Sequence, residues 1–108
     1  MDDAASDAYF EVTVDDGAVP PLIEVSGELD AASSVELGQA LDSALSAGSG
    51  LTLDLGRVTF IDSSALRVVM LAAQRAQADP PQPLTVSEAS DAVRRIFEIT
   101  GVSALLSL

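Results

Sequence analysis

The sequence predicts a small α/β domain built on a mixed β-sheet. Three observations lead to this prediction: strand-like apolar segments alternate with amphipathic helical segments, the first two strand-like segments are joined by a turn, and the chain has only 108 residues. Alternating strands and helices are typical of parallel crossover units, and a chain of this length forms one core. We therefore expect a single domain with a mixed β-sheet of four to five strands and helices packed mainly on one face.

The first two strands are expected to form an antiparallel hairpin. Tyr9 to Val14 alternates apolar and polar residues, Asp15-Asp16-Gly17 is a turn signal, and Val19 to Leu29 supplies the second strand. Two prolines near the start of the second segment predict a loose connection. Residues 1–8 are predicted to be a flexible acidic N-terminal tail, so the domain covers residues 9–108.

A first helix and a third strand follow. Ser33 and Glu36 have the spacing of a capping box, and Asp30 is an alternative cap for an earlier start. The apolar residues of the helix share one face, and glycines end it: Leu37, Leu41, Ala44 and Leu45, then Gly48 and Gly50. The third strand is predicted over Leu51 to Leu55, with polar breaks at Thr52 and Asp54.

The remaining elements continue the alternation. A second helix is predicted over Ser64 to Gln77, with Leu66, Val69, Met70 and Ala73 facing the core, and prolines end it. Leu84 to Val86 is a short fourth strand. Ser90 or Asp91 caps a third helix that ends at Gly101 and faces the core with Val93, Ile96, Phe97 and Thr100. Val102 to Leu108 is the candidate fifth strand.

Composition excludes most self-contained catalytic machinery. The chain has no histidine, cysteine or lysine, and its five basic residues are all arginines: Arg57, Arg67, Arg75, Arg94 and Arg95. Catalytic triads, thiolate or histidine metal sites and lysine Schiff bases are therefore unavailable. We expect a non-enzymatic protein without a cofactor or metal.

The net charge of −12 argues against nucleic acid and anionic membranes as partners, and favours a basic protein surface. The N-terminal segment lacks signal-peptide features, and the longest apolar run, Val68 to Ala73, is too short to span a bilayer. We expect a cytoplasmic protein that is monomeric alone.

One polar cluster stands at the junction of the third strand and the second helix. The run from Val58 to Leu66 begins as the tail of the apolar segment and ends as the first turn of the helix, with Asp62, Ser63 and Ser64 between the two. One such residue suffices to cap a helix, so simple capping and a further function remain equally open. A phosphate at a helix N-terminus is tolerated by the fold, which suits a phosphorylation switch.

Asp30 and Asp54 also lie near strand ends, where α/β sheets carry their sites. Asp30 is either a cap or a site residue, and Asp54 is better read as a hydrogen-bonded break in a strand. A Mg²⁺-dependent enzyme using Asp30, Asp54 and Asp62 is a remote alternative, because no phosphate-binding glycine loop accompanies them.

Three segments together resemble the STAS domain of bacterial anti-anti-sigma factors. They are Gly27-Glu28-Leu29-Asp30, Leu53-Asp54-Leu55, and the run from Val58 to Leu66 that contains Asp62-Ser63-Ser64. The resemblance covers Tyr9 to Leu108 and includes a closing helical segment from Ala92 to Gly101.

This resemblance implies transcription regulation by partner switching. It implies that Ser63 is phosphorylated by an anti-sigma factor with GHKL-type serine kinase activity, and that a PPM-type phosphatase reverses the modification. The unphosphorylated form would bind the anti-sigma factor and release the sigma factor. The implied partner-binding surface comprises Asp30, Asp62, Ser63, Ser64, Ala65 and Arg67.

One departure concerns Ala65, where the family usually has glycine. We expect the added methyl group to hinder close approach of a partner, whereas Arg67 is placed to neutralise a phosphate in part. Small STAS proteins also act as non-phosphorylated accessory subunits that bind an ABC ATPase of a lipid-trafficking transporter. That role is the alternative function.

Overall fold

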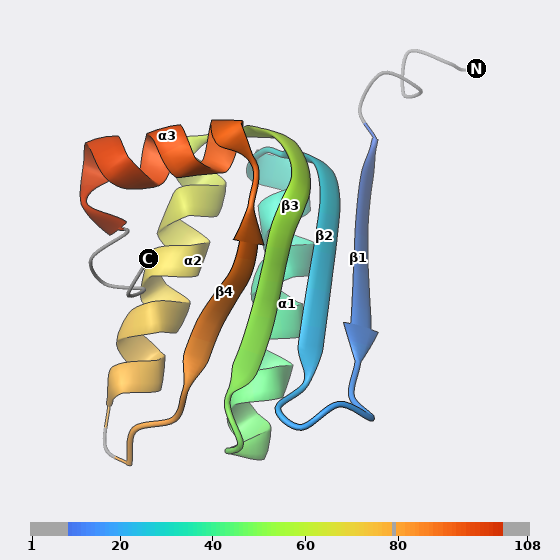
Figure 1. Cartoon of the computed structure of the whole chain (residues 1–108), viewed down its shortest axis with the longest axis vertical. Helices are drawn as coiled ribbons and strands as arrows, with labels where there is room; N and C mark the ends of the chain where they lie inside the picture. The colour runs from blue at the N-terminus through green and yellow to red at the C-terminus, as the bar shows by residue number, and fades with distance from the viewer. Residues whose placement is uncertain (1–8, 79, 103–108) are drawn as a thin grey trace.

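A computed structural model describes residues 9–78 and 80–102 as a four-stranded sheet with three helices (Figure 1). The strand order is β1-β2-β3-β4; β1 is antiparallel to β2, and the other neighbours are parallel. The elements are β1 (Phe10–Asp15), β2 (Leu22–Leu29), α1 (Ala31–Ala47), β3 (Leu51–Ile61), α2 (Ser63–Gln77), β4 (Leu84–Ala89) and α3 (Asp91–Thr100).

This architecture confirms the predicted small α/β domain and its hairpin. The predicted tail over residues 1–8 lies outside the described residues. So does the candidate fifth strand, apart from Val102, which is buried. None of the helices in the described part of the chain is long and apolar enough to cross a membrane.

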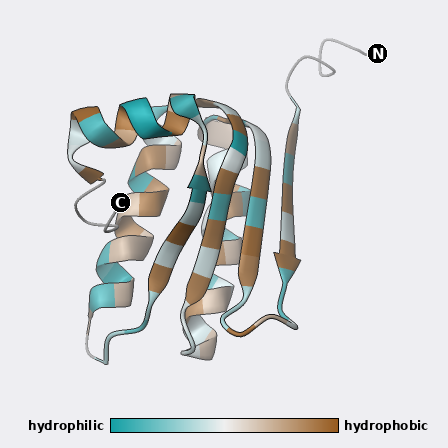
Figure 2. Cartoon of the chain, viewed as in Figure 1, coloured by the Kyte–Doolittle hydropathy of each residue, from teal (hydrophilic) through white to brown (hydrophobic). Residues whose placement is uncertain are grey.

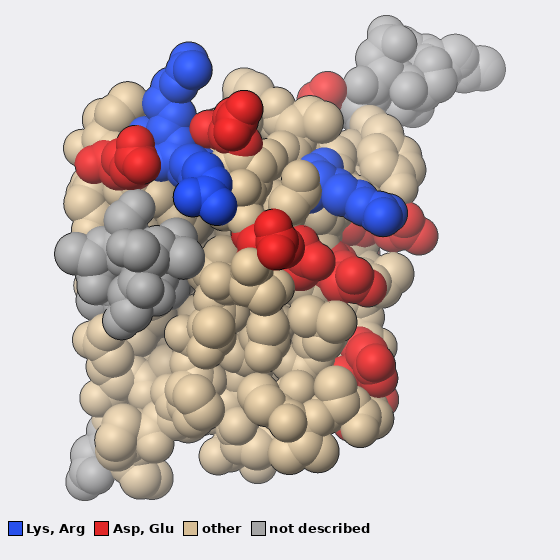
Figure 3. All heavy atoms as spheres, in the orientation of Figure 1, with Lys and Arg blue, Asp and Glu red and all other residues tan. Residues whose placement is uncertain are grey.

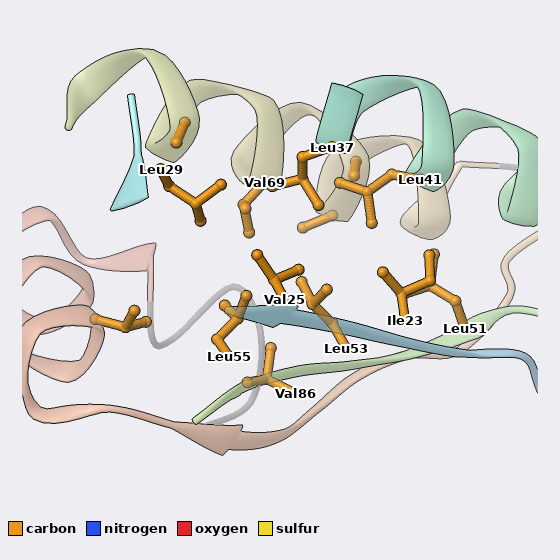
Figure 4. Close-up of a cluster of buried hydrophobic side chains, with 14 of the residues drawn as sticks. Ile23, Val25, Leu29, Leu37, Leu41, Leu51, Leu53, Leu55, Val69 and Val86 are labelled. Atoms are coloured by element: carbon orange, nitrogen blue, oxygen red, sulfur yellow. The ribbon is translucent and has the colours of Figure 1, made fainter. Parts of the chain in front are cut away.

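Helices α1 and α2 lie side by side and cover one face of the sheet (Figure 1). Apolar and polar residues alternate along the strands (Figure 2), so each strand directs one row of side chains toward these helices. Leu37 and Leu41 of α1 meet Ile23, Val25 and Leu53 of the sheet in the buried layer (Figure 4). The third helix, α3, buries Val93 and Phe97 and packs mainly against β3.

Strand β3 is longer than predicted. It spans 11 residues and continues through the segment after Leu55 that the sequence suggested was a junction. Its second half pairs with β2, and Leu29 of β2 lies beside Ile61 of β3. The pattern of apolar residues is irregular here because β-bulges shift the register. Tertiary pairing therefore decides where this strand ends.

The buried face of α2 is rotated relative to the prediction. Val69 and Ala73 are buried as expected, but Leu66 and Met70 are only partly buried. The other buried residues of the helix are all alanines: Ala65, Ala72 and Ala76. Small side chains let a helix approach its neighbours closely, so α2 places its alanines against the core and its larger residues at the margin.

The helix ends also refine the prediction. The side chain of Asp30, the alternative cap, is the N-cap of α1, and the capping box pairs it with Ser33 rather than joining Ser33 to Glu36. In α3 the cap is Ser90. Thr100, predicted to face the core, is exposed and donates a hydrogen bond to the Ile96 carbonyl at 2.7 Å.

Candidate functional site

The candidate site lies where β2 and β3 end side by side. The backbone N–H of Asp62 donates to the Leu29 carbonyl at 3.0 Å, which holds the two strand ends together. The next residues begin α1 and α2, so Asp30 and Asp62 are the N-caps of neighbouring helices. The sheet therefore brings together two carboxylates that are 32 positions apart in the sequence.

Asp62 occupies the amide groups at the start of α2. Its Oδ1 accepts hydrogen bonds from the backbone N–H groups of Ser64 at 2.9 Å and Ala65 at 3.2 Å. The capping role that the sequence left open thus belongs to Asp62. It does not account for either serine side chain.

Ser63 is the first residue of α2, and its side chain is exposed. Within the described part of the chain, its hydroxyl group makes no hydrogen bond. Ser64, in contrast, is half-buried. The geometry leaves Ser63 with the more accessible hydroxyl of the pair.

Asp30 is held by a compact network around Ser33. Its Oδ1 accepts from the Ser33 backbone N–H at 3.0 Å and from the Ser33 hydroxyl at 2.9 Å. These hydrogen bonds favour the ionised carboxylate and lower the pKa of Asp30 below its usual 3.8. A negative charge therefore stands beside the start of α2.

Ala65 does not contribute its side chain to this surface. The residue is 0% exposed and packs in the core, although the sequence suggested that its methyl group faces a partner. Because the Ala65 methyl group packs in the core, it cannot hinder a partner at the surface in the way that the sequence suggested. Arg67 is exposed on the following turn, and no ion pair joins it to another residue in the described ranges.

Asp54 lies away from the other two aspartates. It lies in the first half of β3, and its Oδ1 accepts from the Gly56 backbone N–H at 2.9 Å, as expected for a polar break in a strand. Across residues 9–78 and 80–102, no group of three acidic side chains is arranged to hold a metal ion. The arrangement does not fit the three-aspartate Mg²⁺ hypothesis.

Asp54 instead belongs to an acidic row that the sequence analysis missed. Glu24 and Glu88 pair with it in register on the neighbouring strands. Figure 3 shows acidic side chains gathered over the strands on the face that α1 and α2 leave uncovered, and a hollow of about 320 Å³ lies there. Only the register of three strands aligns these residues, so no local sequence signal reveals the row.

A shallow groove of about 230 Å³ runs between α1 and α2, below the candidate site. Its lining includes Gly38, Val68 and Leu71, and Leu71 is 48% exposed. Val35, on the turn of α1 before Gly38, is 61% exposed. Exposed apolar side chains thus lie on the same two helices that begin at the polar edge.

The fold and the polar edge together define a STAS-type domain. A family model described as "Mlab, STAS domain" matches residues 12–107, and the chain belongs to this STAS-domain family. No curated protein sequence gives a significant match to the chain.

Solved structures share the fold. The chain is similar to an anti-sigma factor antagonist from Mycobacterium paratuberculosis, with a TM-score of 0.78 and 23% identity over 90% of this chain and 82% of that one. It is also similar to the phosphorylated form of the Bacillus cell fate determinant SpoIIAA, with a TM-score of 0.70 and 18% identity over 88% of this chain and 87% of that one. A STAS-domain antisigma-factor antagonist from Rhodobacter sphaeroides matches with a TM-score of 0.56 and 22% identity, over 81% of this chain and 98% of that one.

Proposed function

We propose that this protein is an anti-sigma factor antagonist that acts by partner switching. The unphosphorylated form binds an anti-sigma factor with GHKL-type kinase activity and so releases the sigma factor. Phosphorylation of Ser63 ends that binding, and a PPM-type phosphatase restores it. The observation that carries the proposal is the Ser63 hydroxyl, which is exposed at the start of α2 and makes no hydrogen bond to any residue that the structure describes.

The surroundings of Ser63 support its role as a substrate of another protein. The aspartates beside it are committed to capping, and the chain has no histidine or lysine to activate the hydroxyl. Because Asp62, and not Ser63, accepts the amide hydrogen bonds of Ser64 and Ala65, adding a phosphate to Ser63 changes the surface without removing either of these contacts. Two of the similar structures are anti-sigma factor antagonists, and a third is the phosphorylated form of the Bacillus cell fate determinant SpoIIAA, which agrees with this proposal.

The proposal is tested by incubating the purified chain with its cognate anti-sigma kinase and ATP. Intact-mass measurement should show one added phosphate in the wild type and in Ser64→Ala, and none in Ser63→Ala. Ser64→Ala is the matched control because it removes the neighbouring hydroxyl. Phosphate on Ser63→Ala, or an unmodified wild type, would contradict the assignment of this site.

The accessory-subunit function is a second candidate because the family model that matches is that of the Mlab STAS domain, whereas the similar solved structures are anti-sigma factor antagonists. In that role the same edge would bind an ABC ATPase, and Ser63 would stay unmodified. A stable complex with such an ATPase, together with no phosphorylation by a GHKL-type kinase, would favour this candidate over the first.

A further inference from the structure

Ser63 and Arg67 lie one helical turn apart on the exposed face of α2. Residues at positions i and i+4 of a helix are surface neighbours, with Cβ atoms about 5–6 Å apart. We propose that Arg67 binds the phosphate carried by Ser63 and sets its orientation and charge. This inference rests on the proposed phosphorylation of Ser63 and names the residue that receives its product.

Two of the amide groups at the start of α2 are already occupied. Asp62 already accepts the N–H groups of Ser64 and Ala65, so these amides have no free hydrogen to donate. The carboxylate of Asp62 also repels a phosphate, and Asp30 adds a second negative charge on the neighbouring strand end. Both effects turn the phosphate away from the sheet edge and along the exposed face of α2.

Arg67 is the basic residue nearest to Ser63 along the exposed face of α2. Its guanidinium group has no ion-pair partner in the part of the chain that the structure describes. Arg75, two turns further on, is already paired with Asp42 at 3.0 Å and hydrogen-bonded to Ser46. A planar guanidinium can donate two parallel hydrogen bonds to phosphate oxygens, which makes arginine well suited to this role.

The consequence is that Arg67 shifts the second ionisation of the phosphate toward the doubly charged form. A phosphoserine loses its second proton near pH 6, so nearby charges decide its state in the cell. Asp30 and Asp62 oppose this ionisation, whereas Arg67 favours it. The balance determines whether the modified surface presents one or two negative charges to a partner.

Phosphorus NMR can test this on the full chain with phosphoserine installed at position 63 during translation. The second ionisation of the phosphate is followed by pH titration in the wild type and in Arg67→Gln. Loss of the arginine should raise the midpoint by about 0.3 pH units, as estimated from the strength of an i,i+4 ion pair. Arg75→Gln, on the same helix, is the matched control and should leave the midpoint unchanged.

Equal midpoints in the wild type and Arg67→Gln would overturn the proposal. An equal rise in both arginine variants would also overturn it, because that result indicates a general loss of positive charge. Circular dichroism verifies that each variant is folded, as expected for exposed positions. Since the phosphate is installed without a kinase, failure of any kinase to modify Ser63 would refute the proposed function and leave this result intact.

Discussion

At the residue scale, the residue that caps α2 differs from the residue proposed to be phosphorylated. Asp62 accepts hydrogen bonds from two amide groups of α2, whereas the adjacent Ser63 hydroxyl makes no hydrogen bond among the described residues. The same division does not hold for α1, where Ser33 is bound into the capping box. One aspartate therefore decides which hydroxyl at the sheet edge is free for modification.

Replacing Asp62 with alanine should lower the free energy of unfolding by about 1 kcal/mol, because two N–H groups lose their acceptor. Asp62→Asn should cost less, since its amide oxygen also caps a helix. Urea denaturation measures both. Ser63→Ala is the control and should change stability by less than about 0.5 kcal/mol; a loss equal to that of Asp62→Ala would contradict the division of roles.

Asp30 gives a prediction about pH. Hydrogen bonds from Ser33 lower the pKa of Asp30 below 3.8 in the folded state, so its contribution to stability is present above the unfolded pKa. That contribution is lost as the pH falls through the folded pKa. The difference in unfolding free energy between the wild type and Asp30→Asn should thus be constant from about pH 7 to pH 5 and shrink below about pH 4.

Chemical denaturation at several pH values measures this difference. In a Ser33→Ala background the pH dependence should be weaker but still present, because the hydrogen bond from the Ser33 hydroxyl is lost while the one from the backbone N–H at that position remains. A difference that persists unchanged to about pH 2 would show that Asp30 does not act through its charge.

At the element scale, β1 depends on one glycine of β2. Gly27 has a φ of 95°, and a Cβ there would lie 2.0 Å from the Tyr9 carbonyl oxygen. The Glu28 N–H donates to that same carbonyl at 2.8 Å. A side chain at position 27 would therefore push the start of β1 away from the sheet.

Gly27→Ala is expected to cost on the order of 3 kcal/mol or more, since it adds a backbone clash to the strain of a positive φ. Gly48→Ala provides the matched comparison. Its φ is 88°, but a Cβ would meet no described atom within 4 Å, so only the strain of about 1 kcal/mol applies. Equal losses in urea denaturation would contradict the clash at Tyr9.

At the scale of the whole molecule, uncompensated negative charge shapes the surface. Glu24, Asp54 and Glu88 lie in register across the uncovered sheet face, and like charges on adjacent strands repel. The described residues hold a single ion pair, between Arg75 and Asp42. A surface of this kind favours basic partners over anionic ones.

Salt should therefore stabilise the fold. Raising the NaCl concentration from about 0.02 to 0.5 M shortens the range of charge repulsion and should raise the melting temperature. Glu24→Gln should be more stable than the wild type at low salt and nearly equal to it at high salt. A melting temperature that falls with added NaCl would show that attractive ion pairs dominate instead.

The sequence by itself determined the α/β class, the hairpin, the apolar face of α1 and the polar run from Asp62 to Ser64. These features depend on local periodicity and on the preferences of caps and turns, which neighbouring residues encode. The exclusion of triad and thiolate chemistry followed from composition alone. The sequence also offered Asp30 and Asp62 as possible N-caps, each beside a second interpretation.

Only the tertiary structure decided the length of β3, the burial of Ala65 and the separation of Asp54 from Asp30 and Asp62. Each depends on strand pairing or on the rotation of α2 against the sheet, which residues distant in the sequence impose. Pairing of β2 with β3 placed the two N-cap residues on neighbouring strand ends. Asp62 then accepts the hydrogen bonds of two amide groups at the start of α2. That arrangement left Ser63 exposed and its hydroxyl without a hydrogen bond in the described ranges, which no local pattern could decide.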